Sequence, residues 1–149
     1  MKEKYDMLKL ENQLCFPLYA CSKEIVRRYS PLLDKLELTY TQYITMMVLW
    51  DEKEINVKEL GNRLFLDSGT LTPLLKKLEQ KGYINRSRST EDERNLLIKI
   101  TEKGINLRKK AKNIPEEISK CVNLTQDEAM NLYKILYKIL GTINEEGNK

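Results

Sequence analysis

The chain has 149 residues, of which 41% are hydrophobic and 32% charged, and this balance predicts one globular, helix-rich domain over residues 1–149. No apolar run approaches the roughly 20 residues of a membrane-spanning helix, and charged residues interrupt the N-terminal stretch where a leader peptide would be apolar, so we expect a cytoplasmic protein with reduced cysteines. The chain lacks histidine and has three scattered cysteines without a C-x-x-C spacing, which argues against histidine-dependent catalysis and a metal site, so we expect no enzyme, no metal and no cofactor.

Positive charge is concentrated in the middle of the chain. The formal net charge is +4, whereas residues 76–110 alone carry eleven Lys/Arg against five Asp/Glu. A charge excess of this size is most often a solvated surface. It is also a possible footprint for a polyanion such as DNA.

Four helices, one of them short, are predicted in the first half of the chain. Residues 7–29 form a long one with an apolar stripe, which Pro17 interrupts and is expected to kink. Residues 29–38 hold a turn and a short helix. Two further helices follow at 41–50 and 57–64, the second with apolar residues on one face.

The segment 68–81 has the clearest helical pattern. Leucines recur at 71, 74, 75 and 78, which indicates one buried face, with Asp67 or Ser68 as N-cap and Gly82 at the C-terminal end. After this helix the spacing of apolar residues changes from a helical to an alternating one. Residues 83–88 and 95–101 are therefore predicted as two short strands around a polar tip at 89–94.

Two more helices are predicted near the C-terminus. Thr101 is the expected cap of the first, and Thr125 with Glu128 forms a capping box at the start of the second. The last helix has an uncovered apolar side that the sequence places at Leu132, Leu136, Ile139, Leu140 and Ile143. Because a small core cannot also cover the two terminal helices, we expect them to pack against a second subunit.

Helix, break, helix and basic hairpin is the order of a winged helix-turn-helix, here over residues 41–101. Opposite the leucine stripe the 68–81 helix carries small hydroxyl groups and lysines that suit bases and phosphates, and the hairpin adds arginines that suit a minor groove. The candidate DNA contacts are Ser68, Thr70, Thr72, Lys76, Lys77, Arg86, Arg88 and Arg94. The alternative is an ordinary amphipathic helix and hairpin with solvated charges.

The stretch FLDSGTLTPLLKKLEQKGYINRSRSTEDERNLLIKITEKG, residues 65–104, resembles the MarR family of winged-helix repressors, with D-x-R at 92–94 and a Thr-x-x-Gly turn at 101–104. The likeness extends over nearly the whole chain. It implies a mainly α fold with a small β-hairpin wing, in which residues 7–36 and 102–146 are dimerisation helices. It also implies that Arg94 enters the minor groove and that Asp92 orients it.

The segment LCFPLYACSKEIVRRY, residues 14–29, resembles the organic-hydroperoxide-sensing branch of that family. The likeness implies that Cys15 is the peroxide-reactive thiol, with Tyr19 and Tyr29 as its hydrogen-bond donors. Without the likeness Cys15 would be interpreted as buried filler, as Cys21 still is. Cys121 is a candidate resolving cysteine, and a low-molecular-weight thiol is the alternative partner for oxidised Cys15.

Helix geometry limits which of these side chains can meet. Cys15 and Cys21 are six residues apart, about 9 Å along a helix, which exceeds the roughly 7 Å Cα separation that a disulfide tolerates. Cys15 and Tyr29 are separated by about 21 Å of straight helix. Unless the chain bends sharply, Tyr29 cannot reach Cys15 of its own helix, but it could do so from an antiparallel helix of a second subunit.

The sequence therefore predicts a cytoplasmic, homodimeric repressor that binds a pseudo-palindromic DNA operator and releases it when an organic hydroperoxide oxidises Cys15. Two alternatives remain at this point. One is a repressor of the same family that a bound phenolic small molecule releases. The other is a thiol peroxidase, against which the basic hairpin argues.

Overall fold

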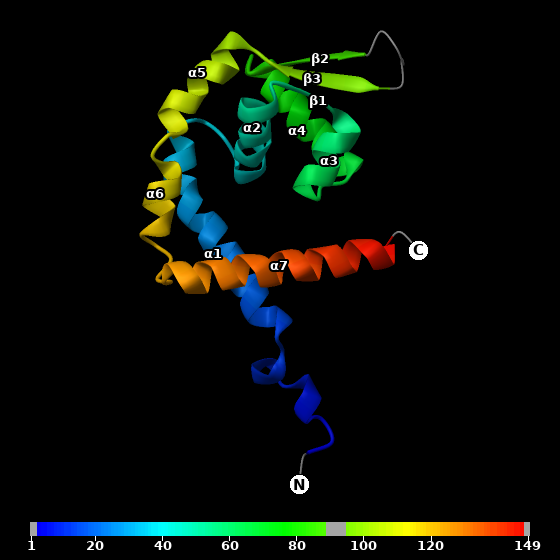
Figure 1. Cartoon of the computed structure of the whole chain (residues 1–149), viewed down its shortest axis with the longest axis vertical. Coiled ribbons are helices and arrows are strands. Elements are labelled where there is room, and N and C mark those ends of the chain that lie inside the picture. The colour runs from blue at the N-terminus through cyan, green and yellow to red at the C-terminus, as the bar shows by residue number, and fades with distance from the viewer. Residues whose placement is uncertain (1–2, 89–94, 148–149) are drawn as a thin grey trace. The chain divides into compact units, whose positions relative to one another are not determined.

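The computed structural model describes residues 3–88 and 95–147 of the chain, which forms two compact units, Met1–Pro115 and Glu116–Lys149 (Figure 1). The first unit holds, in chain order, the 3-10 turns η1 (Asp6–Leu8) and η2 (Leu10–Asn12), α1 (Cys15–Asp34), α2 (Tyr40–Glu52), β1 (Glu54–Asn56), α3 (Val57–Leu64), α4 (Ser68–Gln80), β2 (Ile84–Arg88), β3 (Leu96–Ile100) and α5 (Glu102–Ala111). Helix α6 (Ile114–Ser119) spans the boundary, and α7 (Gln126–Gly147) lies in the second unit.

The core of the first unit forms around α4, whose four stripe leucines are all buried. Asp67 is its N-cap, and Gly82, at φ +84°, ends it. The amide of Gly82 bonds the Glu79 carbonyl and that of Tyr83 bonds the Leu78 carbonyl, which is the bond pattern of a Schellman motif. Helix α4 packs against α2, α3 and β2.

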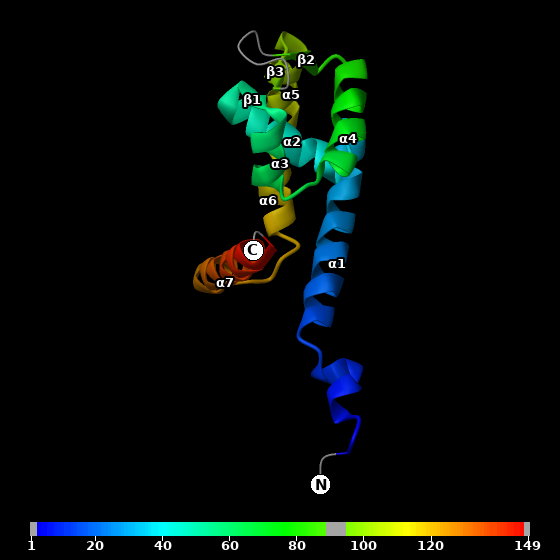
Figure 2. The same cartoon turned by 90° about the vertical axis from the view of Figure 1, so that its right-hand side faces the viewer.

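Helix α1 differs from its prediction at both ends. The stretch before Cys15 is not α-helical but forms the short 3-10 turns η1 and η2. Pro17 therefore lies in the first turn of α1, where its missing N–H removes no helical bond, and the predicted interruption is wrong. The predicted turn at 29–38 is also displaced, because α1 continues through Pro31 to Asp34. Glu37, at φ +56°, lies in the turn that follows. Figures 1 and 2 show α1 as one long helix projecting from the body that α2, α3, α4 and the sheet form.

The sheet has three antiparallel strands in the order β1-β3-β2. Strands β2 and β3 are the predicted hairpin, with Ile84 opposite Ile100 and Arg88 opposite Leu96. Strand β1 was not predicted, because three residues are too few to establish an alternating pattern. It pairs Ile55 with Ile98, both buried, and so anchors the start of α3 to the wing.

Gly104 allows α5 to approach the rest of the first unit closely. Thr101 caps α5 by accepting the Gly104 N–H, as predicted, and the indole N–H of Trp50 donates to the Gly104 carbonyl at 2.8 Å. A Cβ on Gly104 would overlap the carbonyl oxygen of Tyr83 and lie 2.8 Å from Cγ1 of Ile100. The glycine of the Thr-x-x-Gly turn is therefore required by packing.

The second unit is dominated by α7, which begins with the predicted capping box. The Thr125 amide donates to the Glu128 carboxylate at 3.0 Å, and the Glu128 amide donates to the Thr125 hydroxyl at 3.2 Å. Apolar side chains of α7 remain exposed in the single chain, among them Leu132 at 44% and Ile143 at 59%. Across residues 3–88 and 95–147, no helix combines the length and apolar character needed to cross a bilayer.

We expect Gly104→Ala to lower the free energy of unfolding by about 1–3 kcal/mol, because the added methyl group overpacks the contact with β3 and Tyr83. Urea denaturation of the two proteins measures this difference. Gly69→Ala is the matched control, since a Cβ there meets only Oδ1 of Asp67 at 3.6 Å. Equal midpoints for both variants would show that α5 shifts freely to accommodate the methyl group.

Candidate functional site

The outward face of α4 presents the predicted hydroxyl and ammonium groups together. Its N-terminus is fixed by Asp67, whose Oδ1 accepts the Thr70 N–H at 2.7 Å, and the hydrogen bonds from Thr70 hold the pKa of Asp67 below its usual value. The exposed side chains on this face are Ser68, Thr70, Thr72, Lys76 and Lys77. Because the leucine stripe faces the core, these groups must face solvent.

Arg86 joins β2 to α4. Its Nε and Nη2 donate to Oε1 of Glu79 at 3.1 and 3.0 Å, and its backbone amide donates to Oε2 at 3.0 Å. The hydrogen bonds from Arg86 hold the pKa of Glu79 below its usual value. The bonds to Glu79 hold the wing against α4, and the predicted contact of Arg86 with DNA stays a prediction. Glu79 was missed because a single acid on a helix carries no sequence signal for such a pair.

The remaining wing residues are only partly described. Arg88 is exposed at the end of β2, next to the hairpin tip. Asp92 and Arg94 lie outside the described residues, so their proposed roles at the tip stay predictions.

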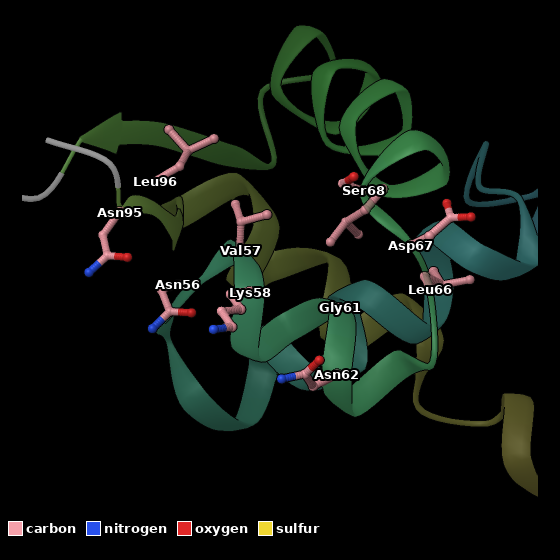
Figure 3. Close-up of a pocket in the computed structure, with 11 residues that line it drawn as sticks. Asn56, Val57, Lys58, Gly61, Asn62, Leu66, Asp67, Ser68, Asn95 and Leu96 are labelled. Carbon is pink, nitrogen blue, oxygen red and sulfur yellow. The ribbon is translucent and has the colours of Figure 1, made fainter. Parts of the chain in front are cut away.

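A cleft of about 400 Å³ opens between α3, the start of α4 and the beginning of β3 (Figure 3). Asn56, Lys58 and Asn95 gather at one side of it, and Asp67 and Ser68 lie at the other. Leu71 and Leu96 contribute to its apolar lining. Sequence reasoning did not find this cleft, because its walls come from three separate elements.

Lys81 links the C-terminal end of α4 to the turn after α1. Its ammonium group donates to the backbone carbonyl of Glu37 and to Oε1 of the buried Gln42 at 3.3 Å. Its own carbonyl accepts from the Lys103 ammonium at 2.7 Å. One residue therefore contacts the end of the α1 segment, α2 and α5.

The three cysteines are all exposed, free thiols in the chain. Cys15 is the first residue of α1, where backbone N–H groups without helical partners gather. Cys21 lies on the same helix, and its exposure means that it fills no core position within the chain. Cys121 lies in the second unit, where its thiol is 3.7 Å from the Glu117 carbonyl.

Tyr29 packs in a cluster of aromatic rings rather than alone. Its ring centroid lies 4.9 Å from that of Tyr40 and 5.8 Å from that of Tyr43, both on α2. Burial raises the pKa of Tyr29 and Tyr40, and burial together with the neighbouring phenols raises the pKa of Tyr43 to about 12, so these phenols keep their protons near neutral pH. Tyr19 is 64% exposed.

Cys15 and Tyr29 lie near opposite ends of α1, fourteen residues apart. This places them about 21 Å apart along the helix axis, so contact within one chain is excluded. The sequence predicted roles for Tyr19 and Tyr29 but gave none to Tyr40 and Tyr43. Their i, i+3 spacing at the start of α2 was the available signal.

Known proteins resemble the chain over most of its length. The profile of the family described as "Transcriptional regulator SarA/Rot" matches residues 27–111. The organic hydroperoxide resistance transcriptional regulator of Bacillus subtilis is 48% identical over 146 residues, 98% of this chain and 99% of that protein.

Solved structures of AbfR, a protein of Staphylococcus epidermidis, have a similar fold. Reduced AbfR bound to DNA is 35% identical, with a TM-score of 0.76 over 95% of this chain and 99% of that one. A disulfide-formed AbfR is 33% identical, with a TM-score of 0.66 over 94% and 96%. The fold, the site and these likenesses agree, and the chain belongs to the MarR-type winged-helix transcriptional regulators, in their organic hydroperoxide resistance branch, and is not an enzyme.

Proposed function

We propose that the protein is a homodimeric repressor that binds a pseudo-palindromic operator when reduced and releases it when an organic hydroperoxide oxidises Cys15. The observation that carries this proposal is the exposed thiol of Cys15 on the first turn of α1. An exposed thiol at this place is accessible to an oxidant from solvent. The resemblance to a hydroperoxide resistance regulator supports the oxidant class.

The DNA-binding half of the proposal uses the outward face of α4. Ser68, Thr70 and Thr72 contact base edges or phosphates in the major groove, and Lys76 and Lys77 contact phosphates. The wing supplies Arg94 to the adjacent minor groove, with Asp92 orienting it and Arg88 nearby. Arg86 acts indirectly, through its bonds to Glu79.

The dimer half of the proposal rests on apolar surface that the chain leaves uncovered. At the start of α1 this surface includes the N-cap residue Leu14, 82% exposed, and Leu18, 42% exposed. On α7 it includes Ile135 and Ile139. Large apolar surfaces of this kind mark protein interfaces, and we assign them to a second copy of the chain.

The proposed chemistry is one stoichiometric oxidation. The Cys15 thiolate attacks an oxygen of the hydroperoxide, the O–O bond breaks, and the released alkoxide takes up a proton and leaves as the alcohol. Cys15 becomes a sulfenic acid. A second thiol, from Cys121 or a low-molecular-weight thiol, then condenses with it, forming a disulfide and releasing water.

The tyrosines take part from both subunits in this proposal. Tyr19, one turn from Cys15, is the local donor. Tyr29 reaches the Cys15 thiolate of the partner subunit. Because the Tyr29 ring packs beside that of Tyr40, both phenols are then placed near this thiolate. Their raised pKa keeps them protonated, which a hydrogen-bond donor to a thiolate requires.

We expect the wild-type protein to be a dimer at micromolar concentration in sedimentation equilibrium. Ile139→Glu places a charge within the exposed apolar surface of α7 and should yield folded monomers. Lys134→Glu, on the same helix, is the control and should leave the dimer intact. A wild-type protein that sediments as a monomer contradicts the proposed dimer.

The redox proposal is tested by measuring operator binding before and after treatment with an organic hydroperoxide. The operator is obtained by selecting duplexes from a random pool on the reduced wild-type protein. Wild type should release it after oxidation, whereas Cys15→Ser should bind equally well before and after. Tyr29→Phe should bind DNA normally when reduced but release it more slowly, because one hydrogen bond to the thiolate is lost.

The response of Cys121→Ser distinguishes the two resolving routes. Irreversible over-oxidation of this variant would assign Cys121 as the resolving thiol. An unchanged, reversible response would assign a small thiol. Release of DNA by oxidised Cys15→Ser would place the sensor elsewhere and overturn the proposal.

Glu79→Gln tests the role of Arg86. Because the pair is partly exposed, we expect the loss in unfolding free energy to stay below about 1 kcal/mol. Operator affinity should nevertheless fall, with an unchanged salt slope, because the wing is held less firmly. Were Arg86 a direct DNA contact, freeing it would instead strengthen binding and steepen the salt slope. Glu117→Gln, which breaks the exposed pair with Lys120, is the control.

A further inference from the structure

Helix α1 ends in a tightly bonded turn. The Leu38 amide donates to the Leu33 carbonyl at 3.1 Å. The Glu37 amide donates to the Asp34 carbonyl at 3.1 Å, and the two bonds together have the pattern of a Schellman motif. Glu37 takes the left-handed conformation, at φ +56°, that glycine usually supplies at this position. Because Leu33 and Leu38 are also buried, the direction of the Glu37 carbonyl is fixed by the end of α1.

Lys81 binds this turn from the end of another helix. It is the C-cap residue of α4, and its ammonium group donates to the Glu37 carbonyl and to Oε1 of the buried Gln42. Carbonyl groups around the C-terminus of a helix carry partial negative charge, so a cation is favoured beside them. Lys81 therefore joins the end of α4 to the turn after α1 and to the first turn of α2.

A second lysine repeats this arrangement at the end of α4. The ammonium group of Lys103, in α5, donates to the Lys81 carbonyl at 2.7 Å and lies 5.0 Å from the centroid of the Tyr83 ring. The backbone of Lys81 is thus bonded to α5, while its side chain is bonded to the turn after α1. Lys81 has little freedom to follow a movement of one of these elements without disturbing its bond to the other.

The bonds of Lys81 and the leucine stripe constrain α4 in different ways. The stripe fixes which face of α4 points away from the core. The bonds of Lys81 act at one end of α4 and connect that end to the segment that follows α1. Tyr29, which in the proposed mechanism meets the Cys15 thiolate of the partner subunit, lies in the C-terminal half of α1. A displacement of Tyr29 therefore reaches the Glu37 carbonyl over a short length of helix.

We propose that Lys81 is the positioning residue through which oxidation of Cys15 changes the orientation of α4. The inference rests on the proposed redox response and names the bond that carries this response from α1 to α4. When the end of α1 moves, the Glu37 carbonyl moves with it and draws the C-terminal end of α4 through the Lys81 side chain. Lys81 itself contacts neither the oxidant nor the DNA in this proposal.

The test separates the oxidation of Cys15 from its effect on DNA binding. Full-length wild type and Lys81→Met are studied reduced and after cumene hydroperoxide treatment that leaves no reduced Cys15 by mass spectrometry. The dissociation constant of the selected operator is measured in both states. Methionine keeps much of the apolar stem but removes the ammonium group, whereas Lys81→Arg retains a donor. Lys112→Met, which changes an exposed lysine just after α5, is the matched control.

The ratio of the oxidised to the reduced dissociation constant measures the coupling between Cys15 and α4. We expect Lys81→Met to lower this ratio roughly 5- to 30-fold, within the usual range of allosteric couplings. The rate of Cys15 oxidation and the operator affinity of the reduced protein should stay near their wild-type values. Lys81→Arg and Lys112→Met should keep the wild-type ratio. A purely structural Lys81 would weaken binding equally in both states, and that unchanged ratio would overturn the proposal.

Thermodynamic linkage supplies a second readout. If oxidation lowers operator affinity, the operator must oppose oxidation by the same factor. In a cysteine–cystine buffer the Cys15 thiolate attacks one sulfur of cystine, a mixed disulfide forms and one cysteine leaves. Saturating operator should raise the fraction of Cys15 that stays a thiol in wild type, and should raise it much less in Lys81→Met. An equal effect of the operator on both proteins would contradict the proposed role of Lys81.

Thermal unfolding shows whether each variant remains folded. Lys81→Ala, which removes the side chain beyond Cβ, is a second loss variant should methionine disturb folding. If oxidised wild type binds the operator as tightly as reduced wild type, the proposed redox response itself has failed. A normal wild-type response with an unchanged ratio in the loss variants overturns only the role of Lys81.

Discussion

The burial of the leucine stripe on α4 is the constraint on which the rest of the DNA-binding half depends. Leu71, Leu75 and Leu78 are at most 1% exposed and Leu74 is 6% exposed, and burying each leucine is worth roughly 1.5–3 kcal/mol. Rotating α4 about its axis would expose several of them at once. The core thus sets the direction in which the hydroxyl and lysine face of α4 points. The wing is positioned relative to α4 by the bonds between Arg86 and Glu79.

Features that depend on nearby residues were predictable from the sequence. The bounds of α3, the caps at Asp67, Thr101 and Thr125, and the buried stripe of α4 each follow from a spacing of three or four residues. The features that were missed join distant parts of the chain or are too short to show a period. Strand β1 has three residues, and Lys81 meets Glu37 across 44 positions.

For the cysteine site the sequence suggested a chemistry, which stays a proposal, but not the surroundings of the thiol. Spacing along one helix already excluded contact between Cys15 and Tyr29 of the same chain, and the structure keeps both on an uninterrupted α1. The exposure of Cys15 and the packing of Tyr29 on Tyr40 required coordinates. A single chain thus holds the thiol at one end of α1 and the phenols at the other, so in the proposed mechanism the sensor is complete only when two chains cross.

The separation of the thiol and the phenols along α1 also suggests how oxidation of Cys15 would alter DNA binding in the proposed mechanism. Helix α1 runs from Cys15 to Asp34, with its interior proline, Pro31, in the last turn, so in the proposed dimer a displacement where the two chains meet is carried along the helix toward that end. At that far end Leu33 is buried and the Glu37 carbonyl is held by Lys81, the residue that caps α4. Because Lys81 also bonds Gln42 of α2, the turn after α1 and the C-terminal end of α4 share one polar contact. A shift of the partner helix against the tyrosine cluster would therefore act on the angle of α4 directly, without unfolding the winged helix.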